Sequence, residues 1–302
     1  MSADAAAPGG GRARVAAVIV SHQTRDDALA CLATLGPAGA DEIVLVDSGS
    51  TDGTADAVRG SFPDALVIEL PNVGYGRAAN VGVTRTTAPV IVVANADTRF
   101  APGSAAALAD DLATHADAGA AGPLVRYPDG RLQASARRFP TLTQAVGHGL
   151  LGLWMPDNRW TRAYRMRDED PTAPKEVDWL SGCALALRRE AFSEVGGFDP
   201  RYFMFVEDVD LAYRLRQHGW RVRFAPAAEV VHAVGASTSH RRVAMVVEHA
   251  RSLDRFYGRV YQRGVGRLLR PLVRVGLAAW VAVVVTWGTV AGRRRGRSTT
   301  GE

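Results

Sequence analysis

Two adjacent carboxylates, Glu207 and Asp208, are the residues of this chain best placed for acid–base chemistry. They follow an apolar, aromatic run that contains Phe203 and Phe205. Apolar neighbours shield a carboxylate from water and raise its pKa, which favours the role of general base. Acids in the first turn of a helix also complement the helix dipole, so the pair alone leaves a structural role open.

Two further acids and a histidine lie where apolar, β-branched runs end. Asp47 and Asp97 each follow such a run, and His232 ends another. A carboxylate at the end of a strand can accept a hydrogen bond from a nucleobase or bind a divalent cation, and neutral imidazole is a common metal ligand. On these residues alone, a turn role for each aspartate and a structural role for the histidine stay open.

The segment from Asn72 to Gly82 contains a glycine pattern that suggests a different chemistry. Gly74, Gly76 and Ala79 have the spacing of the dinucleotide fingerprint, which would indicate an oxidoreductase. That fingerprint normally opens the first strand–helix unit of its domain, whereas here it follows the third predicted strand. The context therefore argues against an oxidoreductase.

The elements that must position these residues alternate between strand and helix. Apolar runs predict strands at 14–21, 41–46, 65–70 and 89–94, with helices at 24–35, 54–59, 76–86 and 102–116. This alternation predicts an α/β fold with a mostly parallel, Rossmann-like sheet flanked by helices. The polar clusters fall at the carboxyl ends of the strands, where open α/β sheets bind ligands.

The second half of the chain predicts fewer regular elements. Residues 133–174 are expected to be irregular, with one helix and the aromatic residues Trp154, Trp160 and Tyr164, and could face an acceptor. Strands are predicted at 177–187, 220–224 and 228–232, and helices at 188–195 and 207–218.

The amino-acid composition excludes few classes of protein, but it bears on the binding partners and the cellular compartment of this chain. The net charge is +5, and Lys175 is the only lysine among 36 basic residues. Together with the many alanines, this indicates a GC-rich genome, so we expect no nucleic-acid partner. Cys31 and Cys183 are too far apart in sequence to indicate a disulfide framework or a metal site, and we expect reduced thiols in the cytoplasm.

Seven short motifs in order carry a family resemblance. They are Val18 to His22, Val46 to Gly53, Asn72 to Gly82, Asn95 to Asp97, Trp179 to Gly182, Gly196 to Asp199 and Glu207 to Asp210. With these motifs, the chain resembles the family 2 inverting glycosyltransferases of the GT-A fold, in particular bacterial rhamnosyltransferase-like members. The resemblance extends over about residues 14–250.

The resemblance implies roles for the motif residues. Asp208 would be the general base, with Glu207 as the alternative, and Trp179 and Gly182 would border the acceptor and the donor sugar. A divalent cation, Mg or Mn, would be held by Asp97 and His232, although Asn95 stands where the Asp-x-Asp motif has its first acid. The nucleotide-sugar donor would lie along Ser21, Gln23, Asp47, Asn72, Gly74, Arg77, Asn95 and Asp97.

The implied activity is the transfer of a sugar, with L-rhamnose as the leading candidate, from a nucleotide sugar to a hydroxyl group. The acceptor would be lipid-linked or a polysaccharide, in cell-envelope glycan synthesis at the cytoplasmic face of the membrane. Two alternatives stay open at this point. One is a polyprenyl-phosphate sugar transferase, and the other is a non-catalytic protein that binds a nucleotide sugar.

The predicted domain organisation is a disordered tail at 1–13, a GT-A domain at 14–245 and a helical extension at 246–302. The extension contains an uncharged apolar segment, 275–292, with arginines on both sides. Its length is borderline for a spanning helix. It could span or re-enter a membrane, lie in the interface anchored by Trp280 and Trp287, or pack inside the protein or an oligomer. Its basic, apolar character predicts an anionic membrane surface as a partner.

Overall fold

The computed structural model describes residues 13–139, 155, 157–166, 168–233 and 242–297, with side chains described as far as 286. The tail predicted at 1–13 lies almost entirely outside this range. So do Trp154, the side chain of Trp287 and those of the arginines at 293–297.

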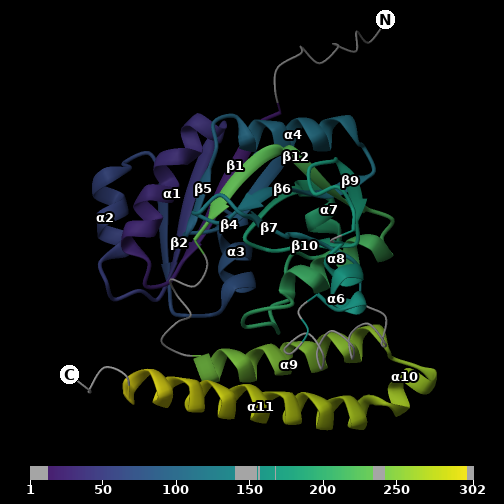
Figure 1. Ribbon diagram of the computed structural model, residues 1–302. Helices are drawn as coiled ribbons and strands as arrows, with labels where there is room; N and C mark the ends of the chain where they lie inside the picture. The colour runs from purple at the N-terminus through teal and green to yellow at the C-terminus, as the bar shows by residue number, and fades with distance from the viewer. Residues whose placement is uncertain (1–12, 140–154, 156, 167, 234–241, 298–302) are drawn as a thin grey trace, which may run out of the picture.

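A central ten-stranded sheet forms the body of the molecule, in the order β3-β2-β1-β4-β11-β6-β12-β5 (Figure 1). The first four strands of that order run parallel. They are β3 (Leu66–Leu70), β2 (Glu42–Ser48), β1 (Val15–Ser21) and β4 (Val90–Asn95). Every residue of β1 is buried, as expected for a central parallel strand with helices on both faces.

Helices cover both faces of the sheet, and β1 shows how the two core layers divide. Val15, Ala17 and Ile19 pack with α1 and α4, whereas Val18 and Val20 pack with α3, α7 and α8. This alternation follows from the two-residue period of a strand. The helices are α1 (Arg25–Ala38), α2 (Thr54–Ser61), α3 (Tyr75–Val83), α4 (Ser104–Thr114), α6 (Arg159–Tyr164), α7 (Arg189–Glu194) and α8 (Glu207–Gln217).

The second half of the sheet is mixed, so the sheet is largely but not wholly parallel. β11 (Ala184–Arg188) is antiparallel to both β4 and β6 (Ala118–Arg126). The two strands predicted at 220–224 and 228–232 are one strand, β12 (Arg221–His232), whose register against β6 shifts between Phe224 and Glu229. Pro226 lies in that interval and has no N–H to donate, which explains the irregularity.

Several very short strands were not predicted individually. β5 (Thr98–Phe100) and β9 (Lys175–Val177) pair with β12, and β7 (Leu132–Gln133) pairs with β6. β8 (Ala136–Arg137) and β10 (Trp179–Leu180) form a separate two-stranded sheet. Strands of two or three residues are too short to show periodicity, so they leave no signal in the sequence.

The C-terminal region is helical, as predicted. It consists of α9 (Arg242–Val260), α10 (Gly264–Leu268) and α11 (Arg270–Arg297). α9 and α11 lie side by side below the α/β domain (Figure 1), joined by ion pairs from Arg270 and Arg274 to Asp254. Within the described part of the chain, no helix is both long and apolar enough to cross a membrane.

Candidate active site

The carboxyl ends of β1 and β2 bring Ser21 and Asp47 side by side, as the parallel register requires. Asp47 is buried, and its Oδ1 accepts a hydrogen bond from the Ser50 backbone N–H at 3.1 Å. The turn role that the sequence left open for Asp47 is therefore present. The Ser21 hydroxyl lies 2.8 Å from that of Thr24, also in the buried interior.

Two loops close around this edge and bring Gln23 and Asn72 to it. Gln23 has a left-handed backbone (φ 56°), and its N–H donates to the Ser50 hydroxyl at 2.9 Å. His22 links the loops, with Nδ1 2.8 Å from the Ser48 carbonyl and Nε2 3.4 Å from the Asn72 amide. Sequence reasoning gave His22 no role, although it lies inside the first motif.

The glycine-rich segment before and within α3 contacts the polypeptide that leads to the carboxylates. Gly74 has φ +90°, and a Cβ there would lie 2.3 Å from the carbonyl oxygen of Phe203. The Arg77 Nε donates to the Pro200 carbonyl at 2.8 Å. Asn80 holds the Phe198 backbone with two hydrogen bonds, of 2.8 and 2.9 Å.

These contacts give the glycine pattern a packing role, and the pattern follows β3 rather than opening the domain. Neither observation supports a dinucleotide site. Contact of Gly74 and Arg77 with a donor stays a prediction.

Asn95, Asp97 and His232 meet at one place, because β4 and β12 end there and β5 begins there. The His232 Nε2 lies 3.2 Å from Asp97 Oδ1 and 3.5 Å from the Asn95 amide nitrogen. Burial lowers the pKa of His232, but hydrogen bonds to Asp97 and Cys183 outweigh it and raise the pKa to about 10. Its Nδ1 lies 3.1 Å from the Gln133 side-chain oxygen, a partner that the sequence did not indicate.

The pair of Asp97 and His232 fits a divalent cation only if another molecule completes its shell. Among the described residues, no group of three or more His, Cys, Asp or Glu side chains could hold a metal ion. Mg²⁺ in particular is commonly bound through one or two carboxylates together with substrate phosphates. A carboxylate oxygen and a deprotonated imidazole nitrogen are a donor set compatible with such a shared cation, which would displace the proton of His232 on binding.

The carboxylate pair lies at the start of α8, after a strained turn. Phe205 and Val206 have positive φ angles of 66° and 69°. This conformation is a real outlier for a β-branched residue, and such strain concentrates at functional sites. The strain sets the direction in which α8 begins, and so where Glu207 and Asp208 point.

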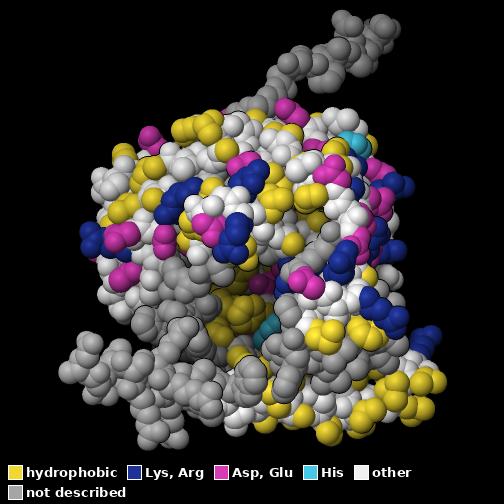
Figure 2. All heavy atoms as spheres, viewed as in Figure 1, with side chains coloured by type: hydrophobic (Ala, Val, Ile, Leu, Met, Phe, Trp, Pro, Cys, Tyr) yellow, Lys and Arg dark blue, Asp and Glu magenta, His cyan; other side chains and the backbone are white. Residues whose placement is uncertain are grey.

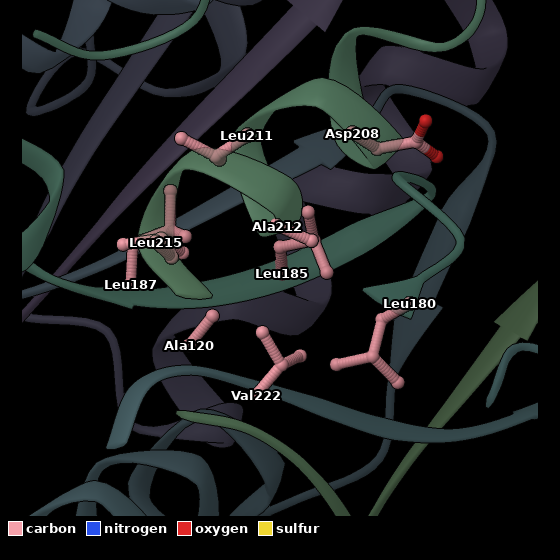
Figure 3. A pocket seen from close by; sticks show the side chains of 9 residues that line it. All are labelled: Ala120, Leu180, Leu185, Leu187, Asp208, Leu211, Ala212, Leu215 and Val222. Carbon is pink, nitrogen blue, oxygen red and sulfur yellow. The ribbon is translucent and has the colours of Figure 1, made fainter. Parts of the chain in front are cut away.

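Asp208 is half-buried and is fixed by two backbone N–H groups. Gly182 donates to its Oδ2 and Val209 to its Oδ1, each at 2.8 Å. Burial raises the pKa of Asp208, while these hydrogen bonds and the charge of Arg137 oppose that rise. Figure 3 shows Asp208 at the edge of a small, mostly apolar pocket under α8, with its carboxylate directed away from the leucines.

Glu207 has a different environment from its neighbour. It is 7% exposed, and its Oε2 has no hydrogen-bond partner among the described residues. Burial, and then the charge of Asp208, raise its pKa to about 8. Burial therefore favours the protonated form of Glu207, whereas the two N–H donors and the charge of Arg137 favour the ionised form of Asp208.

The segment around Trp179 borders Asp208 on the other side. Trp179 is buried on β10, and its indole N–H donates to the Arg138 carbonyl at 3.1 Å. The guanidinium of Arg137 lies over the Trp179 ring (5.8 Å) and the Tyr164 ring (6.0 Å). The sequence motifs included neither Arg137 nor Tyr164.

A buried charge network ties this corner to α9. Asp210 is fully buried and accepts hydrogen bonds from Tyr202 (3.1 Å) and Arg214 (2.7 Å). Arg259 of α9 forms an ion pair with Asp210 at 2.5 Å, and a second one with Asp199. Asp210 thus belongs to the scaffold.

The face of the molecule seen in Figure 2 is hollowed between the α/β domain and the α9–α11 pair. Hydrophobic side chains line much of this hollow, together with acidic and histidine side chains. α9 also supplies aromatic contacts to the corner, since His249 lies against Phe205 and Phe256 against Phe139.

An α/β domain with acids at its strand ends, a carboxylate at a helix start and helices on both faces defines a glycosyltransferase of the GT-A type. The profile of Glycosyl transferase family 2 matches residues 17–196, and the chain belongs to this family. A second profile, described as the N-terminal domain of galactosyltransferase, matches residues 168–237. The predicted family and enzyme class are confirmed.

Relatives and solved structures agree with this assignment. The chain is 40% identical over 247 residues to an N-acetylglucosaminyl-diphospho-decaprenol L-rhamnosyltransferase of Mycobacterium tuberculosis, covering 76% of this chain and 78% of the relative. It is 33% identical over 98 residues to rhamnosyltransferase WbbL of Escherichia coli, covering 32% and 34% of the two chains.

A mannosyltransferase of Pyrobaculum calidifontis, solved with GDP-Man and Mn²⁺, matches with a TM-score of 0.57 and 20% identity over 97% of this chain and 77% of its own. At this identity, the match shows the shared fold.

Proposed function

We propose that this glycosyltransferase moves L-rhamnose from a nucleotide sugar, with dTDP-rhamnose as the leading candidate, to a hydroxyl of a lipid-linked acceptor. The observation that carries the proposal is the carboxylate of Asp208, which accepts hydrogen bonds from the Gly182 and Val209 N–H groups at the start of α8 and points away from the leucines of the pocket there (Figure 3). The mycobacterial relative, named for rhamnosyl transfer to a diphospho-decaprenol acceptor, supports the choice of sugar and acceptor.

The residues divide into two sides. On the donor side, Asp47 with Ser21, Gln23 and Asn72 accommodates the nucleotide, and Gly74 and Arg77 lie along it. Asp97 and His232, with Asn95 beside them, would hold a divalent cation, Mg²⁺ or Mn²⁺, which would neutralise charge on the leaving diphosphate. The mannosyltransferase structure, a complex with GDP-Man and Mn²⁺, supports this cation class.

On the acceptor side, Asp208 accepts the proton of the acceptor hydroxyl, and that oxygen attacks the anomeric carbon from the face opposite the diphosphate. The configuration at that carbon is inverted. Glu207 remains the alternative base, but its burial and raised pKa favour Asp208. Trp179 and Gly182 border the two sugars.

We further propose that α10 and α11 lie on the anionic, cytoplasmic face of the membrane. Their outward stripe is strongly exposed, with Leu268 at 79%, Leu272 at 67% and Val275 at 66%. Every charged residue from Arg263 to Arg297 is an arginine, so a second copy of the same surface would be repelled whereas anionic lipid would be attracted. This contact would hold the hollow next to a lipid-linked acceptor.

The test is a screen of sugar nucleotides with a polyprenyl-diphospho-N-acetylglucosamine acceptor. We expect rhamnosylated lipid with inverted anomeric configuration, and vesicle binding that requires anionic lipid. Transfer to the polyprenyl phosphate itself would instead support the lipid-phosphate sugar transferase. No turnover of any donor, with binding retained, would support a non-catalytic protein.

A further inference from the structure

Arg137 is a largely buried cation that forms no ion pair among the described residues, although the charge of nearby Asp208 acts on it. Its guanidinium donates a hydrogen bond to the carbonyl of the preceding residue, Ala136, at 3.1 Å, and burial lowers its pKa. The next residue in the chain, Arg138, instead pairs with Glu169 at 3.2 Å on the surface. The rings of Trp179 and Tyr164 offset part of the cost of burying the charge, but cation–π contacts contribute only about 0.5–2 kcal/mol.

A second arginine directly follows Tyr164, whose carbonyl accepts a hydrogen bond from the Arg138 N–H at 3.2 Å. Arg165 caps the end of α6, and its charge contributes to lowering the pKa of Arg137. Its Nε is buried and has no hydrogen-bond partner among the described residues. Two neighbouring guanidinium groups without an acid between them make a site of positive potential, and paired arginines suit phosphate oxygens.

The position of this pair relative to the cation site decides which phosphate it faces. The extended segment 133–139 crosses the whole site, and the contacts of its residues show the order in which the parts of the site follow one another. At its start, Gln133 contacts His232 of the cation site, and two residues later the Ser135 carbonyl accepts a hydrogen bond from the Ser181 N–H. Further along, Arg137 is paired in register with Trp179. At its end, Phe139 stacks on Phe256 of α9. Arg137 therefore lies toward α9, with the Ser181–Gly182 turn that holds Asp208 between it and the Asp97–His232 pair.

We propose that Arg137, together with Arg165, binds a diphosphate on the acceptor side, the group that links the acceptor sugar to its lipid. This inference rests on the proposed function and adds the residues that recognise the acceptor. The donor also carries a diphosphate, but that group belongs at the Asp97–His232 pair, on the far side of Asp208. A diphosphate at Arg137 would leave the acceptor sugar within reach of Asp208.

The experiment measures binding of two probes by calorimetry. Farnesyl diphosphate represents the lipid diphosphate, and dTDP with Mn²⁺ represents the donor. We expect Arg137→Gln to weaken farnesyl diphosphate binding by about 10- to 100-fold, the range for hydrogen bonds to a charged group. Binding of dTDP should stay unchanged, and Arg137→Lys should restore affinity only in part, since lysine lacks the bidentate fork.

The matched control is Arg138→Gln, which removes a neighbouring arginine with a surface partner and should change neither affinity. Arg165→Gln is a second variant that should weaken farnesyl diphosphate in the same direction. Unchanged farnesyl diphosphate binding in both variants, or a selective loss of dTDP binding, would overturn the proposal. These measurements need no turnover, so they remain decisive even if the sugar or acceptor hydroxyl of the proposed function is wrong.

Discussion

The donor side of the site comes mainly from consecutive strand–helix units, whereas the acceptor side is assembled from segments far apart in the sequence. Asp47, Asn72 and Asp97 follow β2, β3 and β4 in chain order. Asp208 depends on the turn at Gly182, the segment around Arg137 and the docking of α9.

The two sides also differ in how well their ionisable groups are satisfied, although on the donor side the buried Ser48 hydroxyl has no partner among the described residues. On the donor side, Asp47 and His232 have hydrogen-bond partners within the chain. On the acceptor side, Val206 is strained, and among the described residues a Glu207 oxygen has no partner and Arg137 forms no ion pair. Strain and unsatisfied groups are costs that a fold retains at sites of function. The comparison indicates that the donor side is preformed by local structure and that the acceptor side is held in place by tertiary contacts.

Apart from loss of the general base itself, the largest expected effect concerns the donor side. Chelation of divalent cations should lower transfer by about two orders of magnitude or more, because a Lewis-acid cation contributes several kcal/mol to such chemistry. Asp97→Asn should show the same loss, and the exposed Asp110→Asn should not. Full activity after exhaustive chelation would remove Asp97 and His232 from the metal role.

A smaller loss is expected when the acceptor side is displaced. In Gly182→Ala, the new Cβ would lie 3.2 Å from both Cβ and Oδ2 of Asp208, so the carboxylate must shift. We expect turnover to fall by up to about 10²-fold, since misplacing a reacting group by an ångström has effects of this size. Gly36→Ala, where a Cβ meets nothing within 4 Å, is the control. Equal activity of the two variants would show that Gly182 does not position Asp208.

The contact of α9 with the acceptor side should matter for stability. Arg259→Met removes one partner from two buried acids, but Arg214 and Arg201 still pair with them. We expect a loss of about 1–3 kcal/mol in the free energy of unfolding. Arg263→Met, at an exposed position, should have no effect. If dTDP binding falls more than farnesyl diphosphate binding in Arg259→Met, α9 supports the donor side instead.

The smallest effect on turnover is expected at Glu207. Its folded-state pKa of about 8 lies above the usual 4.5, so its contribution to stability is full below pH 4.5 and is lost as the pH rises toward 8. Glu207→Gln cannot ionise and should flatten the fall in the free energy of unfolding across this interval, measured by denaturant titration. An unchanged pH profile would show that Glu207 is not buried as an acid.

The contrast between the two sides also separates what the sequence could predict from what it could not. The strands ending at Asp47 and Asp97 were predicted within one or two residues, because apolar runs and turn residues mark them locally. The roles of Arg137 and Gln133 were missed, because β7 and β8 have two residues each and show no period. Tyr164 was placed only in a broad region expected to face an acceptor.

Two further features depended on the folded chain. The sequence placed Glu207 and Asp208 together at a helix start but indicated no direction for either side chain. Their different burial follows from the positive φ angles of Phe205 and Val206 and from the approach of Gly182. Likewise, arginine at 259 was predicted to belong to a membrane-facing extension, whereas it is an internal partner of Asp199 and Asp210.

The central claim is that Asp208 is the general base of the transfer. The most direct test measures the turnover of the Asp208→Asn variant, with Glu207→Gln at the neighbouring carboxylate as the matched control. We predict a fall of about two to four orders of magnitude for Asp208→Asn, the range for loss of a general base, with donor affinity unchanged. Glu207→Gln should retain most of the activity. Near-normal turnover in Asp208→Asn, or the larger loss in Glu207→Gln, would contradict the account.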